Sequence, residues 1–296
     1  MLGTDVSRAF AAAGYTVTGT GLAEHIDCGV IGLDITRPDD VHALFQAVRP
    51  HIVLHCAAFT DVDACERDPE LAYKINRDGT SNVARAAEAI GASLMVTSSD
   101  YVFDGQSRVP YTENHEPRPV NVYGASKLAG EKSAMAACQR CFVVRTSWLY
   151  GVLGKNFPYS IVNRAATAPE ISVVDDQIGV PTFTRDLAEA ILWIAENCLP
   201  GTYHVSNTGP TTWYDFARAV LDRCGWDSTR LNPVSSVAYR EAFASPTIRP
   251  SYSVLDNAAL RTVGYGPLRP WQDALTDFLR SAQERGALQM KNAGQP

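Results

Sequence analysis

Helical patterns and short apolar runs alternate along the first half of the chain. The predicted helices span residues 5–13, 38–48, 69–90 and 121–136. The predicted strands are a short one through Val17 and apolar runs at residues 51–57, 93–97 and 141–146. Parallel strands need a crossover connection, which a helix of this length supplies. The alternation therefore predicts an α/β fold with a doubly wound, mostly parallel sheet.

After Gly151 the pattern loosens, because Gly, Pro and Asn become more frequent and the elements shorter. Helical spacing returns at residues 184–197, 212–224 and 271–282. A cofactor domain followed by a smaller substrate domain fits this change in composition. We predict a dinucleotide-binding domain over residues 1–150 and a mainly substrate-binding domain over residues 151–296, with some later segments returning to the first sheet.

Charge and hydropathy argue against several classes of partner. The 296 residues carry a formal net charge of -6 and no cluster of Lys or Arg, which argues against nucleic acid or an acidic membrane surface as the main partner. The longest apolar stretches are too short to cross a bilayer. Residues 1–5 contain no basic segment followed by an apolar one, so no export signal is visible and we expect a cytoplasmic protein.

The seven cysteines are scattered and odd in number, which is typical of reduced thiols in a cytosol. Cys138 and Cys141 form a C-x-x-C motif that could be a redox pair or half of a metal site. No second C-x-x-C and no nearby histidine complete a set of four ligands. We therefore assign no metal ligands from this motif.

Tyr123 and Lys127 lie four residues apart in a predicted helix, so their side chains share one face. A lysine ammonium beside a phenol favours the phenolate and lowers the pKa of the tyrosine. Such a tyrosine can donate a proton to a carbonyl oxygen while hydride adds to the carbon. An ordinary amphipathic Tyr/Lys pair has the same spacing, so the pair alone is only suggestive.

A predicted strand upstream of this helix runs into Ser98 and Ser99. Ligands of open parallel sheets sit beyond the carboxyl ends of the strands. Either hydroxyl would therefore lie where it can help Tyr123 polarise a substrate carbonyl, although serine at a strand end more often makes a turn. The hydroxyl and the Tyr/Lys pair together predict a site for carbonyl reduction.

Five blocks, in order over nearly the whole chain, carry a specific resemblance. They are residues 56–63 (CAAFTDVD), 98–105 (SSDYVFDG), 121–131 (NVYGASKLAGE), 145–150 (RTSWLY) and 174–182 (VDDQIGVPT). Together they resemble the dTDP-4-dehydrorhamnose reductase family of extended short-chain dehydrogenases/reductases. The resemblance implies a Rossmann-like fold and NAD(P)H-dependent reduction of the C4 keto group of a dTDP-sugar, dTDP-4-dehydro-L-rhamnose, to dTDP-L-rhamnose.

The resemblance also assigns roles to individual residues. Tyr123 is the proton donor, Lys127 holds the nicotinamide ribose and tunes the tyrosine, and Ser99 supplies the catalytic hydroxyl where the family usually has threonine. The residues facing the sugar nucleotide are Ser99, Asp100, Trp148 and Arg249, the last as a diphosphate contact for which a surface salt bridge is an equal alternative. The residues lining the cofactor are Gly3, Asp34, Ile35, Ala57, Ala58, Phe59 and Thr60, together with Tyr123 and Lys127.

The phosphate-binding fingerprint of such domains needs a strand, a Gly-rich turn and a helix N-terminus. Gly3 matches the last glycine of the family's G-x-x-G-x-x-G, whereas the preceding strand and the two earlier glycines are absent from this sequence. That strand would lie between the strands near Val17 and Val53, so its loss would leave two exposed edges. A start site placed too far downstream or a real truncation would explain the difference. We expect the chain as written to bind NAD(P)H weakly.

The segment expected to contact the adenosine ribose does not select strongly between NADH and NADPH. Residues 16–22 (TVTGTGL) contain neither the carboxylate that selects NAD nor an arginine, so NADH and NADPH are both compatible, with a slight lean to NADPH. Some family members dimerise around a metal, so the resemblance adds a homodimer with Mg²⁺ at its interface, without assignable ligands. Another nucleotide-sugar short-chain dehydrogenase, such as an epimerase, and a non-catalytic regulatory subunit of the same fold stay open. A dehydratase would want an Asp-Glu pair beside the hydroxyl, which Ser99-Asp100-Tyr101 lacks.

Overall fold

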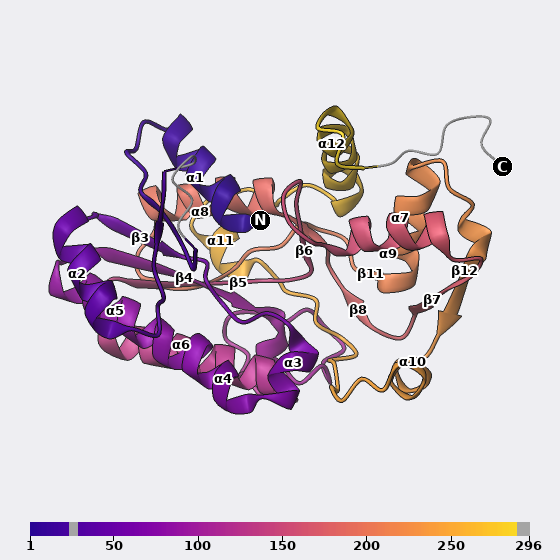
Figure 1. The fold of residues 1–296 in the computed structure, drawn as a ribbon, viewed down its shortest axis with the longest axis horizontal. Coiled ribbons are helices and arrows are strands. Elements are labelled where there is room, and N and C mark those ends of the chain that lie inside the picture. The colour runs from indigo at the N-terminus through magenta and orange to yellow at the C-terminus, as the bar shows by residue number, and fades with distance from the viewer. Residues whose placement is uncertain (24–28, 289–296) are drawn as a thin grey trace.

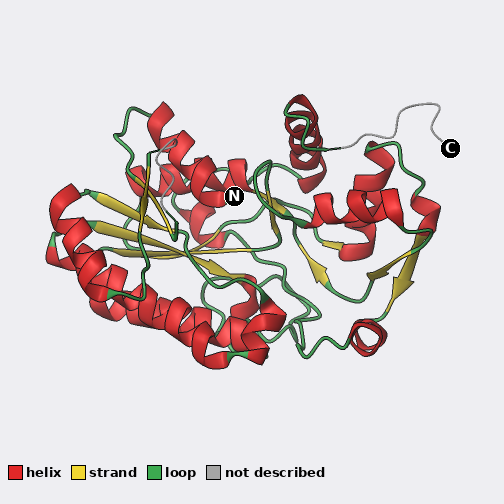
Figure 2. Ribbon diagram, in the orientation of Figure 1, coloured by secondary structure: helices red, strands yellow, loops and turns green. Residues whose placement is uncertain are grey.

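The computed structural model describes residues 1–23 and 29–288. It has a larger lobe in which helices cover both faces of a parallel sheet, and a smaller lobe built from later segments (Figures 1 and 2). This arrangement confirms the predicted α/β class. None of the helices in the described ranges is both long and apolar enough for a bilayer crossing.

The larger lobe contains most of the first half of the chain. Its strands are β1 (Gly19–Gly21), β2 (Val30–Gly32), β3 (Ile52–His55), β4 (Ser93–Ser99) and β5 (Cys141–Thr146). Its helices from that half are α1 (Leu2–Ala12), α2 (Pro38–Val48), α3 (Val62–Arg67), α4 (Pro69–Tyr73), α5 (Thr80–Ala89) and α6 (Val122–Ala137), with a 3-10 turn at Asp100–Val102. The bounds of α2 and β5 coincide with those predicted from the sequence.

Strands β10 (Gly201–His204), β5, β4 and β3 lie side by side in that order, and each neighbouring pair is parallel. Alternate side chains of β4 and β5 enter different cores, as the two-residue period of a strand requires. Met95 and Val144 pack with α1 and with α8 (Thr184–Asn197). Leu94 and Val143 pack with α2, α5 and α6. The centre of the sheet is therefore buried on both faces.

Strands β1 and β2 form a separate parallel pair, and neither is hydrogen-bonded to β3 among the described residues. The two exposed edges expected from the absent strand correspond to two separate sheets, although the first strand begins at Gly19 rather than ending near Val17. β3 is consequently the outer strand of the larger sheet. Its residues Ile52, Val53 and Leu54 are only partly buried.

The predicted long helix over residues 69–90 is confirmed as one continuous helical run over residues 69–89, although it is not α-helical throughout. It consists of α4, a π-helical segment over Lys74–Gly79, and α5. The cause is tertiary: the Asn76 carbonyl lies 2.2 Å from where a Cβ on Gly130 of α6 would be placed. Close packing against α6 accompanies the extra residue in this turn, which apolar periodicity does not reveal.

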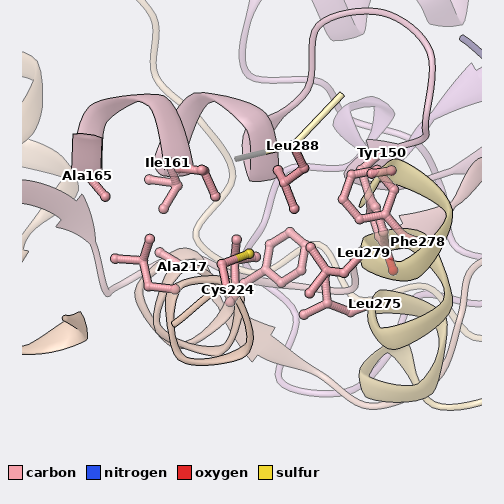
Figure 3. Close-up of a cluster of buried hydrophobic side chains, with 14 of the residues drawn as sticks. Tyr150, Ile161, Ala165, Ala217, Cys224, Leu275, Phe278, Leu279 and Leu288 are labelled. Carbon is pink, nitrogen blue, oxygen red and sulfur yellow. The ribbon is translucent and has the colours of Figure 1, made fainter. Parts of the chain in front are cut away.

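The smaller lobe forms around a core from α7, α9 and α12 (Figure 3). Its elements and the connections to it are β6 (Leu149–Tyr150), α7 (Phe157–Thr167), β7 (Ile171–Val174), β8 (Ile178–Gly179), β9 (Thr182–Phe183), β11 (Thr211–Thr212), α9 (Trp213–Arg223), a 3-10 turn at Ser228–Arg230, β12 (Leu231–Val234), α10 (Ser236–Phe243) and α12 (Trp271–Glu284). Helix α11 (Ala258–Thr262) packs against β10 in the larger lobe. Tyr150 and Phe278 meet edge-on in this core, with ring centroids 5.1 Å apart. β10 and α8 also follow residue 151, yet both belong to the larger lobe.

The cysteines of the described residues are free thiols. Cys138 and Cys141 are buried at the end of α6 and the start of β5. Burial raises the pKa of the Cys141 thiol to about 12. No group of three or more His, Cys, Asp or Glu side chains suited to a metal ion occurs within residues 1–23 and 29–288. The expected Mg²⁺ therefore gains no support.

Candidate active site

The Tyr/Lys helix and the Ser99 strand converge at the carboxyl edge of the sheet. Ser99 is the last residue of β4, and Thr146, the last of β5, is its register partner. Asn121 caps α6 by accepting a hydrogen bond from the Gly124 amide at 2.8 Å, so the N-cap lies two residues before Tyr123. The Ser99 hydroxyl lies close enough to the Tyr123 phenol to influence its pKa. The structure thus brings together the predicted acid and the predicted catalytic hydroxyl.

Gly124 and Gly130 allow α6 to lie unusually close to its neighbours. A Cβ on Gly124 would lie 2.0 Å from the Tyr101 carbonyl oxygen, and one on Gly130 would meet the Asn76 carbonyl. Both contacts are with backbone, which cannot swing aside as a flexible side chain can. The glycines of the Y-G-A-S-K-L-A-G run therefore determine how close the Tyr123 side chain comes to β4.

Burial raises the pKa of the Tyr123 phenol, the neighbouring Ser99 hydroxyl lowers it, and the nearby Asp100 carboxyl raises it. The net direction is upward, so the phenol holds its proton at neutral pH. A protonated phenol is the form that a proton donor to a ketone requires.

Lys127 is buried, and its Nζ donates a hydrogen bond to the Thr97 carbonyl at 2.7 Å. Burial lowers the pKa of its ammonium to about 8, while Glu131 and Cys56 act to raise it. Glu131 is fully buried one turn further along α6 and receives two hydrogen bonds from Arg145 of β5, at 3.0 and 2.7 Å. This ion pair connects the catalytic helix to the centre of the sheet.

Asp100 follows Ser99 and is 2% exposed. One carboxyl oxygen, Oδ1, accepts a hydrogen bond from the Ser99 hydroxyl at 3.0 Å, whereas Oδ2 has no hydrogen-bond partner among the described residues. Burial raises the pKa of this carboxyl to about 6, although the neighbouring Ser253 and Ser99 hydroxyls lower it. A buried oxygen without a partner next to the catalytic hydroxyl is suited to receive a hydrogen bond from a substrate.

Trp148 follows the end of β5, beside the strand that carries Ser99. Its indole is stacked on Trp213 with ring centroids 3.6 Å apart and an angle of 8° between the planes. Trp213 also lines a cavity of about 240 Å³ between the two lobes. Trp148 is therefore in direct contact with a residue of the cavity wall.

Arg249 reaches across the lobes and lines the same cavity. Its guanidinium donates to Asp63 of α3 at 3.0 Å and to the Ser245 hydroxyl at 3.1 Å. It also has a side-chain hydrogen bond with Tyr101, the residue after Asp100. The salt bridge that was the alternative reading of Arg249 is present, and it coexists with a position on the cavity wall.

Several cavity residues carried no signal in the sequence. Arg164 of α7 and Arg240 of α10 line the cavity with Tyr239 and Trp213, and neither arginine has an ion-pair partner within the described ranges. Arg164 instead lies over the Phe243 ring, 6.0 Å from its centroid. These residues come from separate elements of the smaller lobe, so only the folded chain places them together.

The predicted cofactor residues follow the carboxyl ends of the strands, but on two different sheets. Ala57, Ala58, Phe59 and Thr60 follow β3, and Ala57 and Thr60 are exposed. The Phe59 amide donates to Asn76 at 2.8 Å. The exposed Ala57 and Thr60 at this strand end are small, which is compatible with the predicted approach of a cofactor.

The adenine end is built differently. Asp34 and Ile35 follow β2, and the Asp34 carboxylate accepts hydrogen bonds from the Thr36 amide and hydroxyl at 2.9 and 2.8 Å. Ile35 packs onto Gly79 of the π-helical segment. Gly3 lies exposed in the first turn of α1, with open space where a side chain would be, which leaves room for a phosphate at that helix end.

Comparison with known proteins identifies the relatives of this chain. The family model described as RmlD substrate binding domain matches residues 1–284. The dTDP-4-dehydrorhamnose reductase of Streptomyces griseus is 38% identical over 283 residues, which cover 94% of this chain and 89% of that protein. The crystal structure of dTDP-4-dehydrorhamnose reductase from Bacillus anthracis in complex with NADP is 41% identical, with a TM-score of 0.81 over 85% of this chain and 89% of that one. The Clostridium acetobutylicum orthologue is 36% identical, with a TM-score of 0.85 over 95% and 96% of the two chains.

Proposed function

The chain belongs to the RmlD family, and we propose that it reduces the C4 keto group of dTDP-4-dehydro-L-rhamnose to dTDP-L-rhamnose with a reduced nicotinamide cofactor. The observation that carries the proposal is the contact between the Tyr123 and Ser99 hydroxyls beside the buried Lys127. The dTDP-4-dehydrorhamnose reductase of Streptomyces griseus matches 94% of this chain. This similarity favours a reductase over an epimerase. The intact acid, hydroxyl and lysine argue against a non-catalytic subunit.

The reaction adds hydride to the C4 carbon and a proton to its oxygen, so that C=O becomes CH–OH. The nicotinamide supplies the hydride when bound. Tyr123 donates its phenolic proton to the developing alkoxide, and the Ser99 hydroxyl hydrogen-bonds the same oxygen. The protonated Lys127 stabilises the phenolate that is left until solvent returns the proton. The Ser99 and Tyr123 hydroxyls lie close together. A ketone oxygen placed between them can therefore form a hydrogen bond with each.

The cavity between the lobes is proposed to take the nucleoside diphosphate of the substrate. Arg164, Arg240 and Arg249 lie on its wall, and guanidinium groups match the geometry of phosphate oxygens. The aromatic rings of Tyr239 and Trp213 on the same wall suit a planar base or an apolar sugar face. Asp100, with its unpartnered Oδ2, is proposed to receive a hydroxyl of the hexose.

We propose NADPH as the preferred cofactor. Residues 16–22 contain no carboxylate to repel a 2′-phosphate. Asp34, the nearest carboxylate after β2, is engaged by Thr36. The Bacillus anthracis relative was solved with NADP. Side-by-side titration with NADPH and NADH, followed by the quenching of protein fluorescence, measures the preference directly.

A spectrophotometric assay tests the reaction. NADPH oxidation is followed with dTDP-4-dehydro-L-rhamnose, and the product is identified by its mass and by the configuration at C4. Tyr123→Phe, which keeps the ring and removes the proton, serves as the matched control. Absence of turnover by the unaltered chain, despite measured binding of NADPH and the dTDP-sugar, would contradict the proposal and favour the regulatory alternative.

A further inference from the structure

Trp148 has a left-handed backbone, with φ of 45°. Arg49 and Ala244 are the other non-glycine residues of the described ranges with positive φ, and both follow the last residue of a helix, where this conformation is common. Trp148 instead follows a strand. Its conformation carries a free-energy cost for a bulky residue and persists only where the surroundings enforce it.

Two residues at one small antiparallel ladder pack against the Trp148 ring. Strands β8 and β11 pair with Thr211 opposite Gly179 and Thr212 opposite Ile178, so Trp213 directly follows the ladder. Its ring lies 3.6 Å from that of Trp148 and almost parallel to it. A Cβ on Gly179 would lie 2.5 Å from the same indole. The Trp148 indole is therefore in contact with the flat indole of Trp213 and with the side-chain-free backbone of Gly179.

Ser147 and Trp148 are both hydrogen-bonded to the segment from Val180 to Thr182, which leads from β8 into β9. The Ser147 hydroxyl donates to the Val180 carbonyl at 2.7 Å, and the Trp148 carbonyl accepts from the Thr182 amide at 3.3 Å. These contacts hold the main chain, whereas Trp213 and Gly179 hold the ring. The indole is thus restrained independently of any ligand.

We propose that Trp213 and Gly179 are positioning residues that hold the Trp148 indole as a preformed wall for the hexose ring of the substrate. The proposal rests on the proposed function for the identity of the sugar nucleotide. An aromatic ring binds the apolar face of a sugar by stacking, and its benefit depends on the ring being correctly oriented before binding. Gly179 and Trp213 then determine affinity for the hexose without touching the reacting atoms.

Gly179→Ala is the decisive variant, because its added methyl reaches the indole of Trp148 and the backbone of Gly179 does not have positive φ. Binding of dTDP-L-rhamnose and of dTDP alone is measured by calorimetry for this variant, for Trp148→Ala and for the double variant. We expect the Kd of dTDP-L-rhamnose to rise about three- to ten-fold, the range of one aromatic contact. The Kd of dTDP should change less than two-fold, and Gly179→Ala should have no further effect in the Trp148→Ala background.

Circular dichroism gives a readout that needs no ligand. Two stacked indoles produce a coupled signal, which we expect to disappear in Trp148→Phe and Trp213→Phe. Trp193→Phe, on α8 against Tyr265, is the matched control and should keep both the signal and the two dissociation constants. Steady-state kinetics of Gly179→Ala should show a raised KM with kcat nearly unchanged.

Two results would overturn the positioning role: an equal loss of affinity for dTDP and dTDP-L-rhamnose in Gly179→Ala, or the same loss in the Trp148→Ala background. Persistence of the coupled signal in Trp213→Phe would likewise refute the stacked pair. Failure of the proposed function would give a different result: the unaltered chain would keep the coupled signal but bind neither dTDP nor dTDP-L-rhamnose. In that case the Trp148 indole would not serve as a wall for a hexose.

Discussion

At the catalytic end of the sheet, β4 is hydrogen-bonded on both sides, to β3 and β5, and Leu94 at its start is fully buried. At the adenine end, β1 is paired only with β2, and Ile31 of β2 is 36% exposed. Both ends come from the same α/β pattern in the sequence. The difference shows that residues with full main-chain pairing around them are held in place before a ligand arrives, whereas Asp34 and Ile35 depend on fewer neighbours.

The largest effect is expected for the acid at the well-supported end. Tyr123→Phe should lower kcat by about 10²–10⁴-fold, because the ketone oxygen then lacks its proton donor. Its melting temperature and its affinity for NADPH should match those of the unaltered chain, since the ring still packs against Tyr101. A variant that keeps more than a tenth of the activity would show that another group supplies the proton.

The buried ion pair behind the site tests how firmly α6 is attached. Glu131→Gln should reduce the free energy of unfolding by about 3–5 kcal/mol, because Arg145 is left buried without a counter-charge. The double variant Glu131→Leu with Arg145→Leu should recover much of the loss, since no unpaired charge is left. Denaturant unfolding measures both. Equal destabilisation by the single and double variants would mean that packing, and not charge, holds the helix.

A matched pair of truncations compares the two ends directly. Leu94→Ala should cost about 2–5 kcal/mol, as expected for a fully buried leucine, whereas Ile31→Ala should cost about 0.5 kcal/mol or less. Amide hydrogens of β4 should exchange far more slowly than those of β1 and β2. Similar costs and similar exchange rates would remove the contrast between the two ends.

The last predicted effect concerns Asp100 and depends on pH. Its folded pKa of about 6 lies above the ordinary value, so its contribution to stability is present below the unfolded pKa and is lost as pH rises through about 6. Asp100→Asn should therefore raise the free energy of unfolding at pH 8 by on the order of 1–2 kcal/mol and leave it unchanged at pH 3.5. Thermal melts at the two pH values measure the difference, and an equal gain at both would exclude the ionisation as its cause.

The sequence predicted the elements whose local pattern is strong. Pro38 near the start of α2 and the uninterrupted apolar run in β5 indicate their bounds without tertiary information. The proximity of Tyr123 and Ser99 could also be anticipated. Ligand sites lie at the carboxyl edge of a parallel sheet, so both side chains were expected at that edge.

Other features depend on distant parts of the chain. The π-helical segment at Lys74–Gly79 lies against a helix some fifty residues away, so its own periodicity looks regular. Trp213 and Arg240 reach the cavity only because α9 and α10 pack beside β7 in the smaller lobe. Trp148 could be identified as a site residue by resemblance, but its left-handed conformation could not, since that is imposed by its neighbours.

The outer position of β3 has a consequence for handling the protein. Among the described residues β3 has a strand neighbour on one side only, β4, so the alternate amides and carbonyls that point away from β4 have no ladder partner. An unpaired apolar strand is a template on which a strand of another molecule can add. Loss of soluble protein should therefore rise with concentration even well below the melting temperature. Light scattering in a dilution series, rather than a thermal melt, is the measurement that reports the shelf life of this chain.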